Sequence, residues 1–292
     1  MLKQYCRKKC EMIDQALANF IPAENVYPPI IFEAMRYSLF AGGKRLRPIM
    51  LMAAADAVGG VGMHYLNVAC GLEMIHTYSL IHDDLPGMDD DDYRRGKLTS
   101  HKVFGEGMAI LAGDALLTAA FTTMLSQPDV EPAVIVKVLG EISTAAGASG
   151  MIGGQVIDLS SEGKTIDLET LKLMHQGKTG ALFEAALRSG SQLAGGKQWQ
   201  LAALTRYAQQ FGLAFQITDD ILDVTGSQEK IGKPVGSDIR NHKATYVTLY
   251  SIEEAKRMAC QTVENALDAL SQFGTEADVL REMVKSLLIR DR

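Results

Sequence analysis

Residues 63–82 constrain the fold more than any other part of the sequence, because they are apolar nearly all round when drawn as a helix. A surface helix carries one apolar stripe, whereas a helix that is apolar on every side must be enclosed by other elements. Its apolar side chains include Leu66, Val68, Leu72, Ile75, Leu80 and Ile81. We therefore expect a buried central helix with other helices packed around it.

Helical periodicity also dominates the rest of the chain. A first apolar stripe steps by four and three residues through Cys6, Cys10, Ile13, Leu17 and Phe20. A second helix is expected after Pro28-Pro29. Further helices are expected at roughly 107–125, 132–152, 167–190, 198–224 and 245–271. Strand-like alternation is scarce, and no long linker or repeat divides the chain, so we predict one all-α domain over residues 1–292.

Charge and composition exclude several classes of protein. The net charge of −6 argues against a nucleic-acid-binding protein. The polar N-terminal residues are not followed by the apolar run of a secretory signal. No 18-residue stretch is free of charged and polar residues, so we expect no membrane span and a cytoplasmic protein. The four cysteines show no paired zinc spacing and fit reduced thiols.

A first cluster of carboxylates ends the apolar stretch. Asp83 and Asp84 are followed by a Leu-Pro-Gly-Met turn and then by Asp89, with more aspartates at 90–92. Crowded carboxylates repel one another unless a cation neutralises them, and oxygen-only ligands suit Mg²⁺. The turn can bring Asp89 back towards Asp83. Taken alone, the cluster is equally consistent with a solvated acidic loop.

A second cluster lies in the middle of an apolar helical pattern. Asp219 and Asp223 are four residues apart and share a helix face, Asp220 adjoins them, and Gln216 lies one turn earlier. Placing three acids inside a core helix costs free energy. A functional metal site explains this placement better than chance. Two such clusters suggest facing helices that hold several Mg²⁺ ions between them.

Basic groups could supply the partners of an anionic ligand. Residues 42–48 form a Gly-Gly-Lys-Arg-Leu-Arg-Pro turn before a helix, in which Lys44 and Arg47 could hold a diphosphate. An ordinary surface turn is the alternative. His76 precedes Asp83 by seven residues, about 10 Å along one helix face, and is either a core histidine or a substrate contact.

Other cations follow the two clusters. Arg94 and Arg95 either pair with the aspartates at 90–92 or clamp phosphates. Lys178 precedes Thr179 in a Gly-Lys-Thr-Gly segment. Lys233 and Lys243 lie in a polar segment after the second cluster that could close over a ligand. Each lysine alone would be interpreted as solvated surface.

Taken together, these segments resemble the trans-isoprenyl diphosphate synthase family, and within it most closely the bacterial farnesyl diphosphate synthases. They occur in family order through most of the chain, and the joint match is far more specific than any one piece. The matching segments are GGKRLRP (42–48), EMIHTYSLIHDDLPGMDDDDYRRGKLTSH (73–101), GGQVIDL (153–159), GKTGALFEAA (177–186), FQITDDILDVTG (215–226) and GKPVGSDIRNHKATY (232–246).

The resemblance implies a bundle of about ten or more helices around a deep central cavity, usually in a homodimer. It implies three Mg²⁺ ions per site, bound with the allylic diphosphate by Asp83, Asp84, Asp89, Asp219 and Asp223, with Asp220 in the same motif. It assigns the allylic diphosphate to Arg94, Lys178 and Lys233, with Lys243 near it. It assigns isopentenyl diphosphate to Lys44, Arg47, His76 and Arg95. Thr179 and Gln216 would line the region of the carbocation, and Gln155 and Asp158 would support the pocket.

The implied reaction is head-to-tail condensation of isopentenyl diphosphate with dimethylallyl or geranyl diphosphate, releasing pyrophosphate. Tyr78 and Ser79 lie about one turn before Asp83, where a large ring can floor the cavity. The family pattern ties an aromatic residue there, with the longer acidic loop, to a C15 product, so we expect farnesyl diphosphate. Geranylgeranyl or geranyl diphosphate synthase, a terpene cyclase, and a non-catalytic subunit of a prenyl synthase are the alternatives.

Overall fold

The computed structural model describes residues 2–23, 25–225 and 244–290, and most of this described backbone is helical. The fold class predicted from the sequence, all-α, is confirmed. The first half of the chain contains α1 (Leu2–Phe20), α2 (Pro29–Leu39), α3 (Leu46–Ala57), η1 (Gly62–Tyr65), α4 (Leu66–Asp83), β1 (Tyr93–Arg94), β2 (Lys97–Leu98), α5 (Ser100–Phe104), α6 (Glu106–Leu125) and α7 (Pro132–Ala146).

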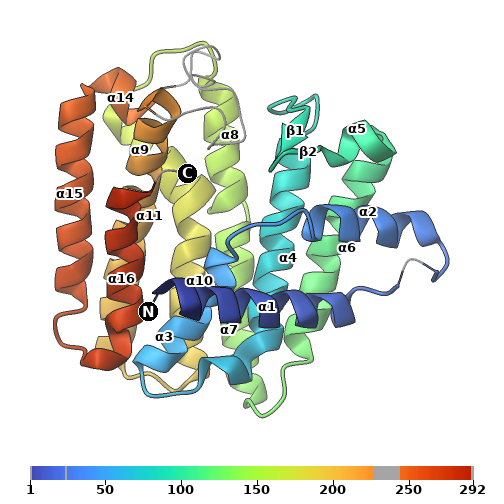
Figure 1. The fold of residues 1–292 in the computed structure, drawn as a ribbon, viewed down its shortest axis with the longest axis horizontal. Helices are drawn as coiled ribbons and strands as arrows, with labels where there is room; N and C mark the ends of the chain where they lie inside the picture. The colour runs from blue at the N-terminus through green and yellow to red at the C-terminus, as the bar shows by residue number, and fades with distance from the viewer. Residues whose placement is uncertain (1, 24, 226–243, 291–292) are drawn as a thin grey trace.

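The second half surrounds the long helix α11. It contains α8 (Met151–Ser161), α9 (Leu168–His175), η2 (Gln176–Gly180), α10 (Ala181–Leu193), α11 (Gln198–Thr225), α14 (Tyr246–Leu249), α15 (Ile252–Ala269), η3 (Thr275–Ala277), α16 (Asp278–Ser286) and η4 (Leu287–Ile289). Most of these helices run side by side, and α1 crosses the front of the bundle (Figure 1).

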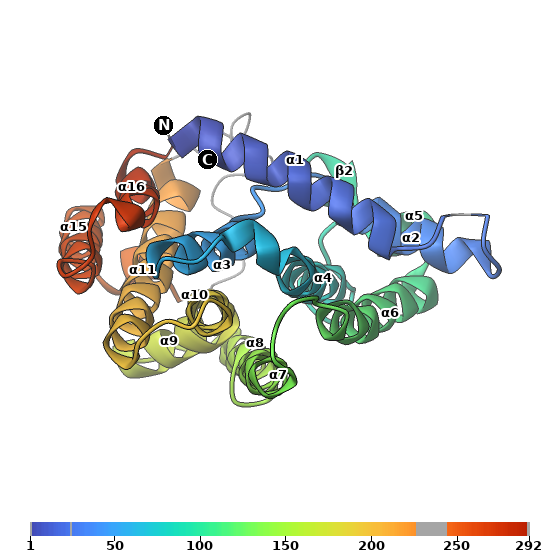
Figure 2. The ribbon, with the colours of Figure 1, turned by 90° about the horizontal axis from the view of Figure 1, so that it is seen from below.

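Helix α4 is the buried central helix that the sequence predicts. Every residue from Val68 to Ile75 is buried. Figure 2 shows α4 between α3 and α6, with α1 along one side. Close packing against α6 depends on small residues, because a Cβ on Gly71 would lie 2.5 Å from Met124. The bulk of the core forms around α4, and a smaller apolar cluster joins α9, α11, α14 and α15.

Three of the expected helices are interrupted. The predicted helix 132–152 is two helices, because the chain turns at Gly147 and Gly150, and a Cβ on Gly150 would lie 2.1 Å from the Ala145 carbonyl oxygen. The predicted helix 167–190 contains a π-helical turn, η2. The predicted helix 245–271 is broken before Ser251, whose side chain caps α15.

Two long apolar helical stretches lie on the side of the bundle away from α1 (Figure 2). Glu106–Leu125 and Pro132–Ser161 could cross a membrane by length and composition alone, with 39% and 33% of their tested windows buried. Core helices of soluble proteins pass the same test, so two such helices are weak evidence for a span. Their exposed apolar side chains are Ile110, Leu111, Leu125, Val136, Ile152 and Val156.

Candidate functional site

The first carboxylate cluster forms where α4 ends. Asp83 is the last residue of the helix, and Asp84 is its C-cap. The turn that follows returns the chain, because the Asp89 N–H donates to the Asp83 carbonyl oxygen at 2.9 Å. Asp89 therefore comes back to the helix end, as its spacing predicts.

Arg94 holds the buried carboxylate of Asp84. Its Nε lies 2.7 Å and 2.8 Å from the two carboxylate oxygens of Asp84, and its Nη2 lies 2.6 Å from Oδ1. Burial disfavours the guanidinium charge, but the bond to Asp84 and the charges of Asp83 and Asp91 outweigh it and raise the pKa of Arg94. Arg94 thus binds the helix end itself, with Asp91 a longer contact at 3.8 Å.

Lys178 and Gln155 bind the neighbouring carboxylate of Asp83. Gln155 Nε2 donates to Asp83 Oδ1 at 2.7 Å. Lys178 Nζ lies 3.4 Å from the same oxygen and 2.7 Å from Asp158 Oδ2. Burial opposes the charge of Lys178, but the two carboxylates raise its pKa. The ammonium group therefore remains charged between α4 and α8.

Two glycines bring η2 close enough to α8 for this contact. A Cβ on Gly154 would lie 1.9 Å from the Lys178 backbone nitrogen, and one on Gly177 would lie 2.9 Å from the Gly154 Cα. The π-helical turn carries Lys178 and Thr179 on consecutive positions. Its close approach to α8 fixes where both side chains lie.

The second carboxylate cluster is connected to the first through η2. Thr179 Oγ1 donates to Gln216 Oε1 at 3.2 Å, while the preceding residue, Lys178, contacts Asp83. Gln216 Nε2 in turn donates to Asp220 Oδ1 at 3.3 Å. Through these two consecutive residues of η2, polar contacts link the end of α4 to the last turns of α11.

Asp220 is buried and holds the start of α14. Its side chain belongs to a residue that is 3% exposed, and its Oδ2 accepts the backbone N–H of Tyr246 at 2.7 Å. Thr245 and Thr248 form a capping box at the same helix start. Asp220 thus anchors the residues that follow the undescribed stretch 226–243.

Asp219 lies one residue earlier and is far more accessible, with 42% of its side chain exposed. Arg290, the residue after η4, pairs with its Oδ1 through Nη2. The Arg290 guanidinium also lies 4.5 Å from the centre of the Phe215 ring. Loss of hydration among the surrounding atoms disfavours the charged carboxylate and raises the pKa of Asp219. The positive charges of Arg290 and Lys44 partly offset this effect.

Two arginines at the start of α3 differ in their surroundings. Arg45 is 3% exposed and binds Glu73 and Asp14 at 3.0 Å and 2.9 Å. The Arg47 guanidinium lies 4.5 Å from the centre of the Phe183 ring, and its Nε finds no hydrogen-bond partner among the described residues. Burial lowers the pKa of Arg47 to about 10, which still leaves it charged at neutral pH.

His76 and Arg95 lie beside Arg47. Burial, and then the charges of Arg47, Arg95, Arg94 and Arg45, hold the pKa of His76 well below its usual value, so the ring is neutral at pH 7. The Arg95 guanidinium donates to the Gly42 carbonyl and lies over Gly43, where a Cβ would be 2.6 Å away. This corner therefore holds more cations than carboxylates to balance them.

The residues expected to set product length lie on α4. Tyr78 is 5% exposed, and its ring meets His82 edge-on with the centroids 5.6 Å apart. Its hydroxyl has no hydrogen-bond partner among the described residues. Ser79 donates to the His76 carbonyl at 2.8 Å. Tyr78 is thus packed within the bundle on the helix that carries Asp83.

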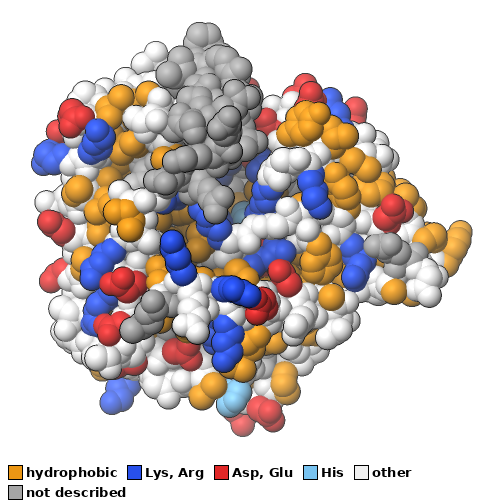
Figure 3. Space-filling view, viewed as in Figure 1, with side chains coloured by type: hydrophobic (Ala, Val, Ile, Leu, Met, Phe, Trp, Pro, Cys, Tyr) orange, Lys and Arg blue, Asp and Glu red, His pale blue; other side chains and the backbone are white. Residues whose placement is uncertain are grey.

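The described site residues predicted from the sequence gather around α4, η2 and α11, and Lys44 acts on Asp219 from the turn before α3. Lys and Arg side chains are visible in the middle of the face that Figure 3 displays. Lys233 and Lys243 lie outside the described residues. Sequence reasoning missed three participants, namely Glu73, Arg290 and the Tyr246 amide. An acid at position 73 of an apolar helix was the one available signal; the other two contacts span 71 and 26 residues.

The carboxylates fit a hard divalent ion in chemistry, although they do not enclose one by themselves. Within residues 2–23, 25–225 and 244–290, no three His, Cys, Asp or Glu side chains converge into a group that could hold a metal ion. Each cluster instead presents oxygens held by protein cations. Such a donor set suits Mg²⁺ that completes its shell with water and phosphate oxygens.

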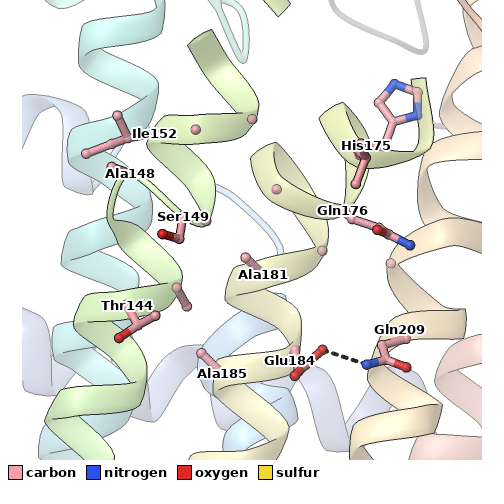
Figure 4. A pocket seen from close by; sticks show the side chains of 18 of the residues that line it. Thr144, Ala148, Ser149, Ile152, His175, Gln176, Ala181, Glu184, Ala185 and Gln209 are labelled. Atoms are coloured by element: carbon pink, nitrogen blue, oxygen red, sulfur yellow. Dashed lines mark hydrogen bonds between the residues drawn. The ribbon is translucent and has the colours of Figure 1, made fainter. Parts of the chain in front are cut away.

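A separate groove of about 1250 Å³ lies between α7, α8, η2, α10 and α11. Figure 4 shows its walls, including Glu184 and Gln209, which share a hydrogen bond of 3.1 Å. Ala148, Ala181 and Ala185 form part of its lining. None of the site residues predicted from the sequence lines it, so this groove is distinct from the carboxylate site.

Comparisons with known proteins agree with this geometry. Residues 28–287 match the family model described as polyprenyl synthetase. A geranylgeranyl diphosphate synthase from Cyanophora paradoxa is 49% identical over 94% of this chain and 92% of its own length. A farnesyl diphosphate synthase from Geobacillus stearothermophilus is 44% identical over 99% and 98%. The structure of geranylgeranyl pyrophosphate synthetase from Pyrococcus horikoshii superposes with a TM-score of 0.90 at 33% identity, covering 99% of this chain and 98% of that one.

Proposed function

Because the chain belongs to the polyprenyl synthetase family of prenyltransferases, we propose that it condenses isopentenyl diphosphate head to tail with dimethylallyl and then geranyl diphosphate. The expected products are farnesyl diphosphate, with 15 carbons, and pyrophosphate. The observation that carries this proposal is the corner formed by the cations Arg47 and Arg95 and the neutral His76 beside two clusters of carboxylates. Two diphosphates, one of them bound with metal, would balance both kinds of charge.

In this proposal the carboxylates bind the metal ions, and two sets of basic side chains bind the two diphosphates. Asp83, Asp84, Asp89, Asp219 and Asp223 would hold three Mg²⁺ ions. Arg94, Lys178, Lys233 and Lys243 would face the allylic diphosphate, and Lys44, Arg47, His76 and Arg95 would bind isopentenyl diphosphate. Arg47 suits this role because its guanidinium is charged and its buried Nε lacks a hydrogen-bond partner among the described residues.

The chemistry follows from electrostatics and positioning. When bound, Mg²⁺ would neutralise charge on the departing pyrophosphate and so favour ionisation of the allylic carbon–oxygen bond. Lys178 and Arg94 would add positive charge on the same side. The Thr179 hydroxyl and the Gln216 amide oxygen, 3.2 Å apart, would direct lone pairs towards the carbocation. The double bond of isopentenyl diphosphate would then attack the allylic carbocation. The adduct would lose a proton to the released pyrophosphate.

Product length is proposed to depend on Tyr78. Its ring occupies the interior about one turn from the Asp83 carboxylate, where it would stop a growing chain. Relatives at similar identity carry both farnesyl and geranylgeranyl synthase names, so C20 remains the nearest alternative product and C10 the next.

Chromatography of the products made from dimethylallyl and isopentenyl diphosphate with Mg²⁺ tests this proposal. We expect C15 from the natural sequence and a longer product from Tyr78→Ala, because the substitution removes the ring. Tyr27→Ala, at a position that is 90% exposed, is the matched control. An unchanged product from Tyr78→Ala would place the floor elsewhere.

The same assay separates the other functions. A terpene cyclase would consume an allylic diphosphate without isopentenyl diphosphate, whereas the second basic set supports a two-substrate reaction. A non-catalytic subunit would show no turnover on its own. Product formation that requires both substrates and Mg²⁺ would exclude both.

We also propose that the chain is a cytoplasmic homodimer that pairs through α6, α7 and α8. Ile110 and Leu111 on α6 and Val136 on α7 are exposed apolar residues, and these helices lie on the side of the bundle away from α1 (Figure 2). Burying an apolar face of this kind is a common source of association energy. Light scattering of Leu111→Lys should show a shift towards monomer, and an unchanged dimer would direct attention to another face.

A further inference from the structure

Arg290 makes a contact with the second carboxylate cluster that the proposed function does not use. Its guanidinium pairs with Asp219 Oδ1 and lies on the Phe215 ring, and both partners lie on α11 four residues apart. The arginine side chain is only 14% exposed. A cation from the segment after α16 thus occupies a predicted metal-binding carboxylate.

The contact leaves the arginine incompletely satisfied. A guanidinium has five N–H donors, and the Nε and Nη1 of Arg290 are buried without a hydrogen-bond partner among the described residues. Unmade hydrogen bonds of buried charged groups are costly. The Asp219 carboxylate and the Phe215 ring therefore hold the guanidinium in a position where its other N–H groups have no hydrogen-bond partner among the described residues.

The segment that carries Arg290 has few other anchors. Leu287 is 5% exposed, but Leu288 and Ile289 are 42% and 80% exposed. The Arg290 contacts with α11 therefore contribute much of what holds these residues in place. Arg94, by contrast, engages both oxygens of Asp84 from the β1–β2 ribbon.

We infer that Arg290 is the internal counter-ion of Asp219 and that a divalent metal ion competes with it for Oδ1. A metal ion and a guanidinium cannot share one carboxylate oxygen at full strength, because like charges repel. Arg290 is thus a positioning residue: it neutralises the cluster before metal and diphosphate arrive, and the ion displaces it. The inference rests on the proposed role of Asp219 as a metal ligand.

Competition has a quantitative consequence. Only molecules in which Asp219 is not paired with Arg290 can bind the metal ion. The apparent metal affinity is therefore the intrinsic affinity multiplied by the fraction of such molecules. Removing the arginine should therefore tighten metal binding, the reverse of what loss of a ligand does. Breaking a partly exposed ion pair corresponds to roughly a two- to fivefold change in affinity.

Titration of the full chain with Mn²⁺ in the presence of pyrophosphate, followed by calorimetry, tests the inference without relying on turnover. Arg290→Gln should lower the apparent Kd for Mn²⁺ roughly two- to fivefold, and Arg290→Lys should shift it less because it keeps the charge. Lys285→Gln, which alters an exposed ion pair on α16, should leave the Kd unchanged. Asp219→Asn reports on the proposed function and should weaken Mn²⁺ binding.

The outcomes are distinguishable. Weaker binding in Asp219→Asn with an unchanged Kd in Arg290→Gln would overturn the inference and leave the proposed metal site intact. Weaker pyrophosphate and Mn²⁺ binding in Arg290→Gln would also overturn it, by making Arg290 a diphosphate ligand. No change in Asp219→Asn would remove Asp219 from the metal site and the inference with it. As a second readout, Arg290→Gln should lower Tm in EDTA, and the difference should shrink with saturating Mn²⁺ and pyrophosphate.

Discussion

The two carboxylate clusters have similar sequences but are held in different ways. At the end of α4, Asp83 and Asp84 are bound by Gln155, Lys178 and Arg94, and the close approach of η2 to Gly154 on α8 fixes the position of Lys178. In the last two turns of α11, the partners come from short elements late in the chain. Arg290 follows the short helix η4, and the Tyr246 amide begins the four-residue helix α14.

This difference indicates which half of the site is preorganised. A group positioned by packed elements holds its geometry before substrate binds, whereas short peripheral elements open at lower free-energy cost. We therefore expect the first cluster to tolerate little change in its supports. The second should respond more to ligands and solution conditions.

The largest expected effect comes from removing one carboxylate from either cluster. Asp83→Ala and Asp219→Ala should each lower kcat by about 10³-fold or more, because each removes a group that acts on developing charge. Thermal melts should show that the fold persists. Steady-state kinetics with saturating Mg²⁺ measure the effect, and near-normal activity would remove that acid from the mechanism. Asp92→Ala, in the same loop as the first cluster but paired with Lys102 at the surface, is the control.

A smaller effect should follow from displacing a support of the first cluster. Gly154→Ala places a Cβ 1.9 Å from the Lys178 backbone nitrogen, so η2 must move away from α8. A misplacement of about 1 Å can cost 10²-fold in turnover, and we expect a loss of about that size. Gly140→Ala has open space around it and should retain full activity. Equal activities in the two variants would mean that the first cluster is not sensitive to its supports.

A still smaller effect on turnover is expected at Asp220. Because this buried residue holds the Tyr246 amide, Asp220→Asn should act through position and cost about tenfold, less than Asp219→Asn. Weakening the bond to Tyr246 should also lower the free energy of unfolding by about 1–3 kcal/mol. Kinetics and urea unfolding on the same preparations give both numbers. A larger kinetic loss in Asp220→Asn than in Asp219→Asn would reverse the roles assigned to the two residues.

The last prediction concerns pH and a residue that borders both clusters. His175 packs against the Tyr246 ring, with centroids 5.5 Å apart, and directly precedes η2. Burial lowers its pKa from 6.5 to about 4. Between these two pH values the unfolded chain is protonated at this histidine and the folded chain is not. The free energy of unfolding therefore decreases by up to ~3 kcal/mol as the pH falls from about 6.5 to about 4.

Urea midpoints measured between pH 7 and pH 4 report this loss. His175→Gln should show a shallower pH dependence, because its side chain does not titrate in that range. His101→Gln, at a second buried histidine, is the matched control. Parallel curves for the natural sequence and His175→Gln would assign the acid sensitivity to other groups.

Sequence patterns predicted the parts of this molecule that depend on regular periodicity. The all-round apolar character of residues 63–82 identified the central helix, and the apolar flanks of Asp219 and Asp223 placed those acids on a long helix. The turn after α4 was also predictable, since a Leu-Pro-Gly-Met segment cannot continue a helix.

Other features depend on contacts that no local pattern records. The π-helical turn at residues 176–180 has ordinary helix-forming neighbours, and only its approach to Gly154 reveals it. Nothing in the sequence around Arg290 distinguishes it from a surface arginine, and its contact with Phe215 is visible only in the fold. The Asp220–Tyr246 bond uses a backbone amide, which carries no sequence identity at all.

That bond also ties two helices together. Tyr246, at the start of α14, is held by Asp220, which lies five residues before the end of α11 at Thr225. A substitution at Asp220 would therefore release the start of α14 from the helix that carries Asp219 and Asp223.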